Sequence, residues 1–242
     1  MSRWFVRDGG PIHYDRAVRD GEVDKKGVFT TIDAPGAGRR TGQGTTAVDI
    51  NKAGVVVGWY ISSKNVTHGF VLNGGRFRTV DEPHAAKTLG GTVLNGIADD
   101  GTMSGVFTDT SQRQHGFWLR QGTFHQVDVP GARNTDVACI SDRSGLLVGG
   151  YQVRGQSRFT GFTDQHGVFR SLRDPSATLG TLPQCGNDGG RVAGFYITQI
   201  GHMSVTRGFR FTPGTLSGAA SERGQRGPGV LQAPVSPRLG RP

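Results

Sequence analysis

Three side chains are the candidates for exchanging protons with a bound molecule: His84, His202 and Asp136. An imidazole titrates near neutral pH, and a carboxylic acid approaches that range when burial raises its pKa. His84 and Asp136 stand where corresponding positions of neighbouring segments carry smaller or uncharged residues, and His202 lies in a segment, 198–207, expected to be a long loop. These three residues are the predicted catalytic set.

Eight further residues depart from the surrounding pattern and form the predicted substrate-binding set: Arg39, Arg40, Asp49, Trp59, Asn95, Arg133, Phe195 and Met203. The aromatic and thioether side chains would give a pocket an apolar floor, and the guanidinium groups would attract an anionic ligand such as a carboxylate. Loops of a basic protein also gather arginines without binding anything, so a purely structural interpretation stays open.

The elements that must position these residues belong to an internal repeat. The dipeptide Gly-Phe begins at Gly69, Gly116, Gly161 and Gly208, at spacings of 47, 45 and 47 residues. Three further marks accompany it in fixed order: a Phe before a hydrophobic–acid–x–Pro segment, a threonine before an isoleucine, and a glycine within a strand. Each unit divides into four β-branched and aromatic runs separated by Asp, Gly and Ser turns, as antiparallel strands require. Units of this size and strand number are typical of β-propeller blades.

We therefore predict an all-β fold, a small β-propeller with four blades of four antiparallel strands. The last unit supplies only three strands, so the N-terminal segment Val28–Asp33 is expected to pair with it and close the last blade. In the alternative, Trp4–Val6 and Ile12–Tyr14 join the C-terminal tail to make a fifth blade. The propeller would occupy residues 27–214, between an N-terminal extension (1–26) and a tail (215–242) whose Pro, Gly and Arg content predicts disorder.

The repeat resembles the bacterial His-Ala-Phe-type extracellular repeat family. The residues that carry the resemblance are His68-Gly-Phe70, His115-Gly-Phe117, the Val-Asp-x-Pro-Gly-Ala segment of Val127 to Ala132, and the run from Asp49 to Gly58. It covers roughly residues 28 to 212, implies the propeller fold and a secreted protein, and implies no activity.

Residues that recur with the repeat are expected to be scaffold. His68 and His115 precede Gly-Phe, and Asp33, Asp81 and Asp128 precede x-Pro, so we interpret them as turn residues and predict no metal site. Cys139 and Cys185 occupy equivalent positions of neighbouring units. Regular strands would point them in the same direction, which predicts two buried thiols and no disulfide.

Composition narrows the function classes. Glycine makes up 40 of 242 residues, and no apolar run is long enough for a membrane span. The net charge is +9, but there is no Lys/Arg run or basic helix. Nucleic acid is therefore not an expected partner, whereas a small anionic ligand is.

The N-terminal residues bear on the location of the protein. Arg7 and Asp8 fall where a signal peptide needs an apolar core, which predicts a cytoplasmic protein, or a secreted one if translation starts upstream.

Two functions are compatible with these observations. The favoured one is a monomeric, cofactor-free cyclase or isomerase of bacterial secondary metabolism, whose pocket holds a mostly apolar, anionic small molecule in one reactive conformation. No nucleotide-binding loop, flavin or nicotinamide motif is present. The alternative is a non-catalytic scaffold that binds a glycan or another protein.

Overall fold

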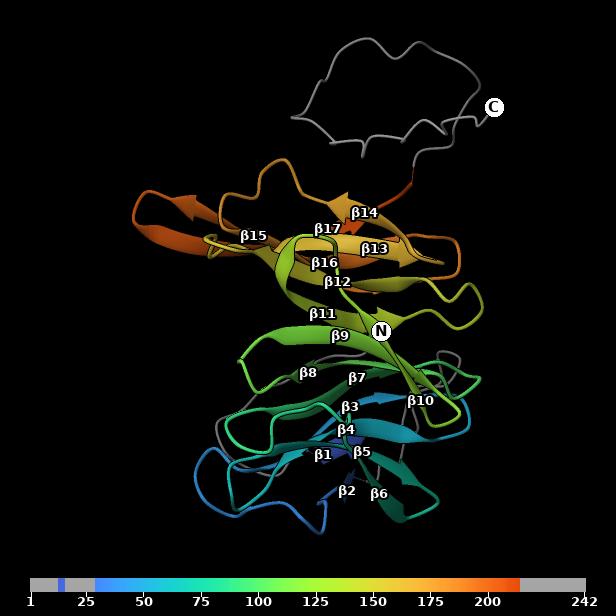
Figure 1. The fold of residues 1–242 in the computed structure, drawn as a ribbon. Coiled ribbons are helices and arrows are strands. Elements are labelled where there is room, and N and C mark those ends of the chain that lie inside the picture. The colour runs from blue at the N-terminus through green and yellow to red at the C-terminus, as the bar shows by residue number, and fades with distance from the viewer. Residues whose placement is uncertain (1–12, 16–28, 214–242) are drawn as a thin grey trace, which may run out of the picture.

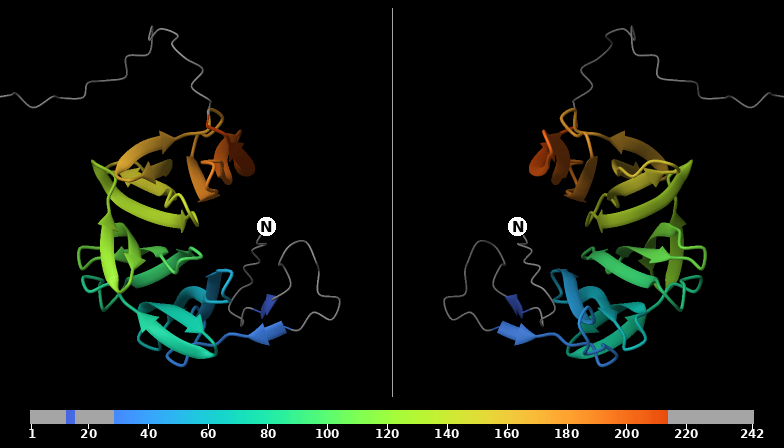
Figure 2. Two further views of the ribbon diagram at one scale, coloured as in Figure 1. Left: turned by 90° about the vertical axis from the view of Figure 1, so that its right-hand side faces the viewer. Right: turned by 90° about the vertical axis from the view of Figure 1, so that its left-hand side faces the viewer.

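The computed structural model describes residues 13–15 and 29–213, and these residues form 17 strands and no helix. The strands make four successive antiparallel units arranged along an arc (Figure 1; Figure 2). The all-β prediction is confirmed. None of the described segments is a helix able to cross a membrane.

The strands of the first two units follow the repeat closely. In the first unit they are β3 (Gly44–Ile50), β4 (Val56–Ile61), β5 (Thr67–Asn73) and β6 (Arg76–Val80). In the second unit they are β7 (Gly91–Ile97), β8 (Met103–Thr108), β9 (Gln114–Arg120) and β10 (Thr123–Val127). A single parallel bridge, Thr67 to Gly91, joins the two units into one sheet.

The third unit also has four strands, and the fourth has three. The third contains β11 (Ala132–Ile140), β12 (Leu147–Val153), β13 (Thr160–Gln165) and β14 (Val168–Leu172). The fourth contains β15 (Gly180–Gly186), β16 (Val192–Ile200) and β17 (Met203–Phe211). Two short strands, β1 (His13–Asp15) and β2 (Phe29–Thr31), pair with each other at the start of the arc.

The marks of the repeat are explained by two sets of contacts. The repeated Phe residues of the third and fourth strands pack on each other, with ring centroids 5.2–5.7 Å apart, and the inner ring of each pair is fully buried. The repeated threonine accepts a backbone N–H from the segment that enters its unit. These bonds are Ala34 to Thr45 (2.9 Å), Glu82 to Thr92 (2.9 Å), Val129 to Thr135 (3.1 Å) and Asp174 to Thr181 (3.0 Å).

The first strands of successive units lie against one another and form the inner wall of the arc. Each contains a β-bulge at the same place, after Ala47, Leu94, Val137 and Pro183. The strand glycine is required beside it: a Cβ on Gly105 would strike the carbonyl oxygen of Val93, and the other units repeat this close approach. The bulge bends the strand and re-aims the side chains that follow it.

Successive units are also joined at the turn after each first strand. The backbone N–H of Lys52 donates to Asp99 (3.0 Å), that of Asp99 donates to Asp142 (2.9 Å), and that of Arg143 donates to Asp188 (2.8 Å). Each of the last three units therefore supplies a carboxylate to the unit before it. We call the side of the arc that carries these turns the turn face, and the opposite side, where chain crosses from unit to unit, the crossover face.

The structure corrects the prediction that the N-terminal strand closes the last blade. Its residues Phe29–Thr31 pair with β1, while β17 pairs with β16 and, among the described residues, no strand lies along its other edge. Figure 2 shows the two ends of the arc apart. The segment after β2 is anchored to the first unit, where Ile32 and Ala34 pack in the core. The four-bladed propeller stays a prediction, and the tail invoked for a fifth blade lies outside the described residues.

The prediction of two separate thiols was wrong, because Cys139 and Cys185 form a disulfide with their Cα atoms 5.1 Å apart. That prediction assumed regular strand alternation. Both cysteines directly follow the bulge, and the first strands converge on the inner wall so closely that a Cβ on Gly96 would lie 3.4 Å from the Cα of Cys139. Equivalent positions of neighbouring units therefore meet there, and the bond ties the third unit to the fourth.

Candidate functional site

Two members of the predicted site meet on the inner wall. The Asn95 side-chain amide on β7 donates to Asp136 Oδ1 on β11 (2.9 Å) and to the carbonyl oxygen of Val137 (3.0 Å). Asp136 is half-buried on the inner wall, and this burial raises its pKa to about 6, although the Asn95 hydrogen bond acts in the opposite direction. Burial likewise raises the pKa of Asp49, whose carboxylate accepts the N–H groups of Ile97 and Ile50.

We expect Asp136→Asn to change how stability depends on pH. The folded protein binds the Asp136 proton more tightly than the unfolded chain, so this contribution is complete below about pH 4 and is lost as the pH rises to about 6. The variant should remove a decrease of about 1–3 kcal/mol in the free energy of unfolding across that interval. Urea unfolding at pH 4, 5, 6 and 7 measures it. Identical pH profiles for the variant and the wild type would contradict the assignment.

The remaining predicted catalytic residues lie apart from Asp136. His84 is 82% exposed and hydrogen-bonds through Nδ1 to Glu82 (3.0 Å). The segment 198–207 is mostly strand, because β16 and β17 continue to a tight turn at Gly201 and His202. His202 is therefore an exposed residue at the tip of a hairpin. The predicted catalytic set does not form one constellation.

The predicted apolar floor does not form either. Trp59 on β4 and Phe195 on β16 are half-buried in different units, and Met203 is 68% exposed at the hairpin tip. Arg39, Arg40 and Arg133 are exposed loop or strand-end residues. None of the eleven predicted site residues lines either of the two cavities described below.

A cavity of about 420 Å³ opens on the crossover face between the first and second units. Its walls are the β4–β5 loop and the segment that connects β6 to β7. The polar side chains at its lining are Ser62, Ser63, Lys64, Thr67, His68, Asp81, Glu82 and Lys87. Val66, Ala85 and Ala86 supply apolar surface. This cavity is the candidate functional site.

Asp81 orients the His68 ring at this cavity. The Nδ1 atom of His68 lies 2.9 Å from Asp81 Oδ2, and the ring stacks on Tyr60 with centroids 5.1 Å apart. Within the described residues the structure gives no partner to Nε2 of His68. The arrangement holds the ring with one nitrogen paired and the other available to a ligand.

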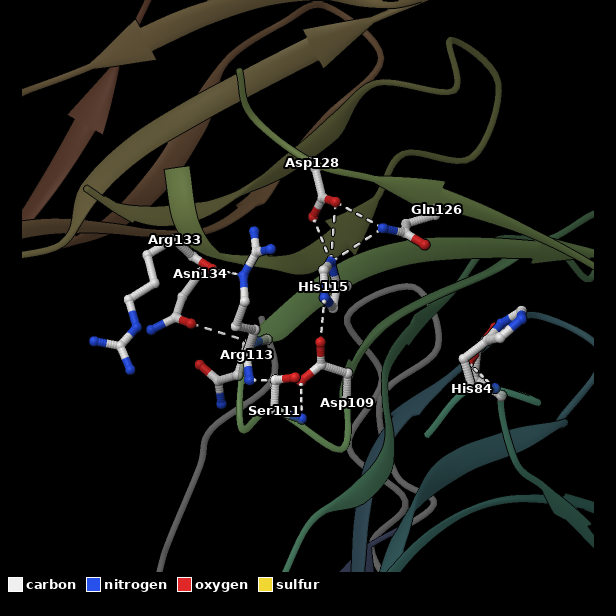
Figure 3. Close-up of polar contacts among 11 residues, drawn as sticks. His84, Asp109, Ser111, Arg113, His115, Gln126, Asp128, Arg133 and Asn134 are labelled. Carbon is white, nitrogen blue, oxygen red and sulfur yellow. Dashed lines mark hydrogen bonds and ion pairs between the residues drawn. The ribbon is translucent and has the colours of Figure 1, made fainter. Parts of the chain in front are cut away.

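The next unit contains the same pair in a closed setting. His115 Nδ1 lies 2.9 Å from Asp128 Oδ2, but its Nε2 lies 3.3 Å from Asp109 Oδ2, and Gln126 also contacts the ring (Figure 3). Burial raises the pKa of Asp109, but N–H groups of Arg113 and Ser111 and the His115 ring outweigh it and lower the pKa. The recurring pair is thus part of the scaffold, and the first unit differs because Ser62 stands in place of Asp109.

The length of the connecting segment explains why only one of these two positions is open. Ten residues separate β6 from β7, at 81–90, whereas β11 begins at Ala132, soon after β10 ends at Val127. The short connection brings the Arg133 carbonyl oxygen to Arg113 Nε (3.3 Å) and Asn134 Oδ1 to the Gln114 N–H (3.1 Å). Aligning the repeats against each other, with attention to segment length and to Ser62, would have found this site in the sequence.

The described residues contain no group of three His, Cys, Asp or Glu side chains placed to hold a metal ion. The prediction of a site without metal or cofactor concerns the whole chain and stays a prediction.

Comparisons with known proteins found no matching protein family and no match among curated proteins. Among solved structures, a triple arginine-to-alanine mutant of AofleA from Arthrobotrys oligospora is similar over 86% of this chain, with a TM-score of 0.46 and 16% identity. AofleA itself is similar over 78% of this chain, with a TM-score of 0.44 and 14% identity. This chain spans 65% and 59% of the length of those two chains. Neither similarity assigns a ligand to this protein.

Proposed function

We propose that this protein binds a small, partly apolar anion in the cavity between its first two repeats. The observation that carries the proposal is the convergence of Lys64, Lys87 and the open nitrogen of His68 on a cavity of about 420 Å³. The two acidic side chains at the cavity are already engaged, Asp81 with His68 and Glu82 with His84. The volume falls within the range of small-molecule sites, and charged donors beside apolar surface suit a carboxylate on a hydrocarbon body.

Catalysis is the second candidate, and the contrast between His68 and His115 favours it. A histidine held through Nδ1 by a carboxylate can accept a proton at Nε2 from a bound molecule. That is the step a cofactor-free isomerase or cyclase needs. His68 replaces His84 and His202 as the proposed base, because neither of those is held against a cavity.

The test of binding is isothermal titration calorimetry with 3-phenylpropionate as the probe. We expect wild-type protein to bind it and Lys64→Ala/Lys87→Ala to bind it at least about tenfold more weakly, since each lost charge-assisted hydrogen bond is worth more than about 1 kcal/mol. Lys52→Ala is the control, because it removes a lysine charge from the turn face, away from the cavity. Wild type that binds no probe, or a control that loses as much affinity as the double variant, would contradict the proposal and favour the glycan- or protein-binding scaffold.

A location in an oxidising compartment is supported by the Cys139–Cys185 bond, since disulfides persist there and are rare in the cytoplasm. We therefore propose the secreted alternative in place of the cytoplasmic one. The expectations of a monomer without nucleic-acid or membrane partners are retained as proposals.

A further inference from the structure

A second cavity, of about 410 Å³, lies on the turn face between the second and third units. Trp118, Ile140 and Leu147 provide its apolar surface. Its charged lining residues are Asp100, Arg120, Asp142, Arg143, Asp164 and His166. None of these residues lines the cavity on the crossover face.

Asp164 is the residue of this cavity that breaks the repeat. It lies on β13 where the other three units carry Leu72, Leu119 and Phe211, and its strand neighbours are Leu147 and Phe169. The side chain is 6% exposed. A carboxylate at a position built for a large apolar side chain costs stability unless a partner compensates it.

The structure leaves that compensation incomplete. Asp164 Oδ1 is buried and has no hydrogen-bond partner among the described residues. Burial raises the pKa of Asp164, with the Gly167 N–H and the His166 ring acting against it. A buried acceptor without a donor is rare in folded proteins, and a bound molecule can supply the donor.

Three of the other charged groups at the cavity have partners, and two cationic side chains, Arg143 and His166, also line it. Asp100 pairs with Arg120 (3.4 Å), and Asp142 accepts the backbone N–H of Asp99. Trp118 stacks one face on His125, with centroids 3.7 Å apart. The surface between Trp118 and Asp164 therefore combines an aromatic wall with a buried carboxylate oxygen that has no hydrogen-bond donor among the described residues.

We propose that this cavity binds a small organic ammonium ion, with the ammonium group donating to Asp164 and the hydrocarbon part lying against Trp118, Ile140 and Leu147. An ammonium group supplies the missing donor and offsets the charge, and it can interact favourably with an indole ring. A neutral hydroxyl supplies the donor but leaves the charge, and a carboxylate supplies no donor.

Phenethylammonium is the probe that tests the site, and isothermal titration calorimetry at pH 7.5 is the measurement. We expect wild-type protein to bind it at least about tenfold more tightly than phenethyl alcohol, which has the same body and no charge. The Asp164→Asn and Asp164→Leu variants should both lose this preference. Because Leu is the residue of the first two units, Asp164→Leu should also raise Tm, which shows that the variant is folded.

Variants at the other cavity separate this proposal from the proposed function. Lys64→Ala/Lys87→Ala should leave phenethylammonium binding unchanged, and Asp164→Asn should leave 3-phenylpropionate binding unchanged. The proposal is overturned if the wild type binds the amine and the alcohol equally, if it binds neither, or if Asp164→Leu retains the preference for the amine.

Discussion

Phe117→Ala is expected to lower the free energy of unfolding by about 3–5 kcal/mol, because it removes a fully buried ring and leaves a cavity that its surroundings cannot fill. Phe117 is 0% exposed and packs edge-on against Phe124, with centroids 5.2 Å apart, and against Phe107 at 6.4 Å. Both contacts are within its own unit, so the loss should be felt as destabilisation of the second repeat. Urea denaturation monitored by circular dichroism measures the change.

The chain provides a matched control in Phe209, the same residue of the repeat in the fourth unit. No fourth strand covers it among the described residues, and it is only partly buried. Phe209→Ala should therefore cost less than half as much as Phe117→Ala. Equal losses would mean that another strand covers β17 in solution, contrary to the arrangement described above.

Removing the disulfide, in a Cys139→Ala/Cys185→Ala variant, is expected to cost about 4 kcal/mol of unfolding free energy. The bond spans 46 residues, and tying a loop of that length lowers the entropy of the unfolded chain by a corresponding amount. It is also the covalent link between the last two units. Urea denaturation of the variant beside the oxidised wild type measures the difference.

Reduced wild-type protein is the control for that experiment. With dithiothreitol present, its stability should approach that of the double variant, and the variant itself should not respond to the reductant. If the variant is as stable as the oxidised wild type, the expectation that a Cys139–Cys185 bond stabilises the protein by restricting the unfolded chain is wrong.

Much of the fold could be predicted from the sequence because the repeat presents each signal several times. Three residues mark every complete unit: a Phe in the third strand, a Phe in the fourth strand and a threonine in the first strand. These marks predicted the strands correctly, and the contacts of these residues explain why they recur. Closure could not be predicted in the same way. It depends on how far each unit turns relative to the next, which is a property of packing between units and not of pattern within one.

The site was harder to predict because departures from the repeat have two origins. Arg39, His202 and Met203 depart from it on exposed surfaces, where little constrains them. Ser62 stands where the second unit has the carboxylate of Asp109, and Asp164 stands where the other units place large apolar side chains. A change at either position must alter the surroundings. Only the burial of a position distinguishes a departure that matters from one that does not, and burial at Ser62 and Asp164 depends on the neighbouring unit.

The hydrogen bonds between successive turns have a direction that makes the two ends of the arc unequal. At the turns, an array shortened by its last unit would return the N–H groups of Arg143 and Ser144 to water. An array shortened by its first unit would lose, among these turn bonds, the donors to Asp99. In a repeat array each unit is stabilised mainly by its neighbours. Local unfolding is therefore favoured in a unit that has one neighbour and whose turn N–H groups have no carboxylate of a following unit to donate to. Among the described residues the fourth unit is in that situation, and the Cys139–Cys185 bond is placed where it keeps this unit from opening independently of the others.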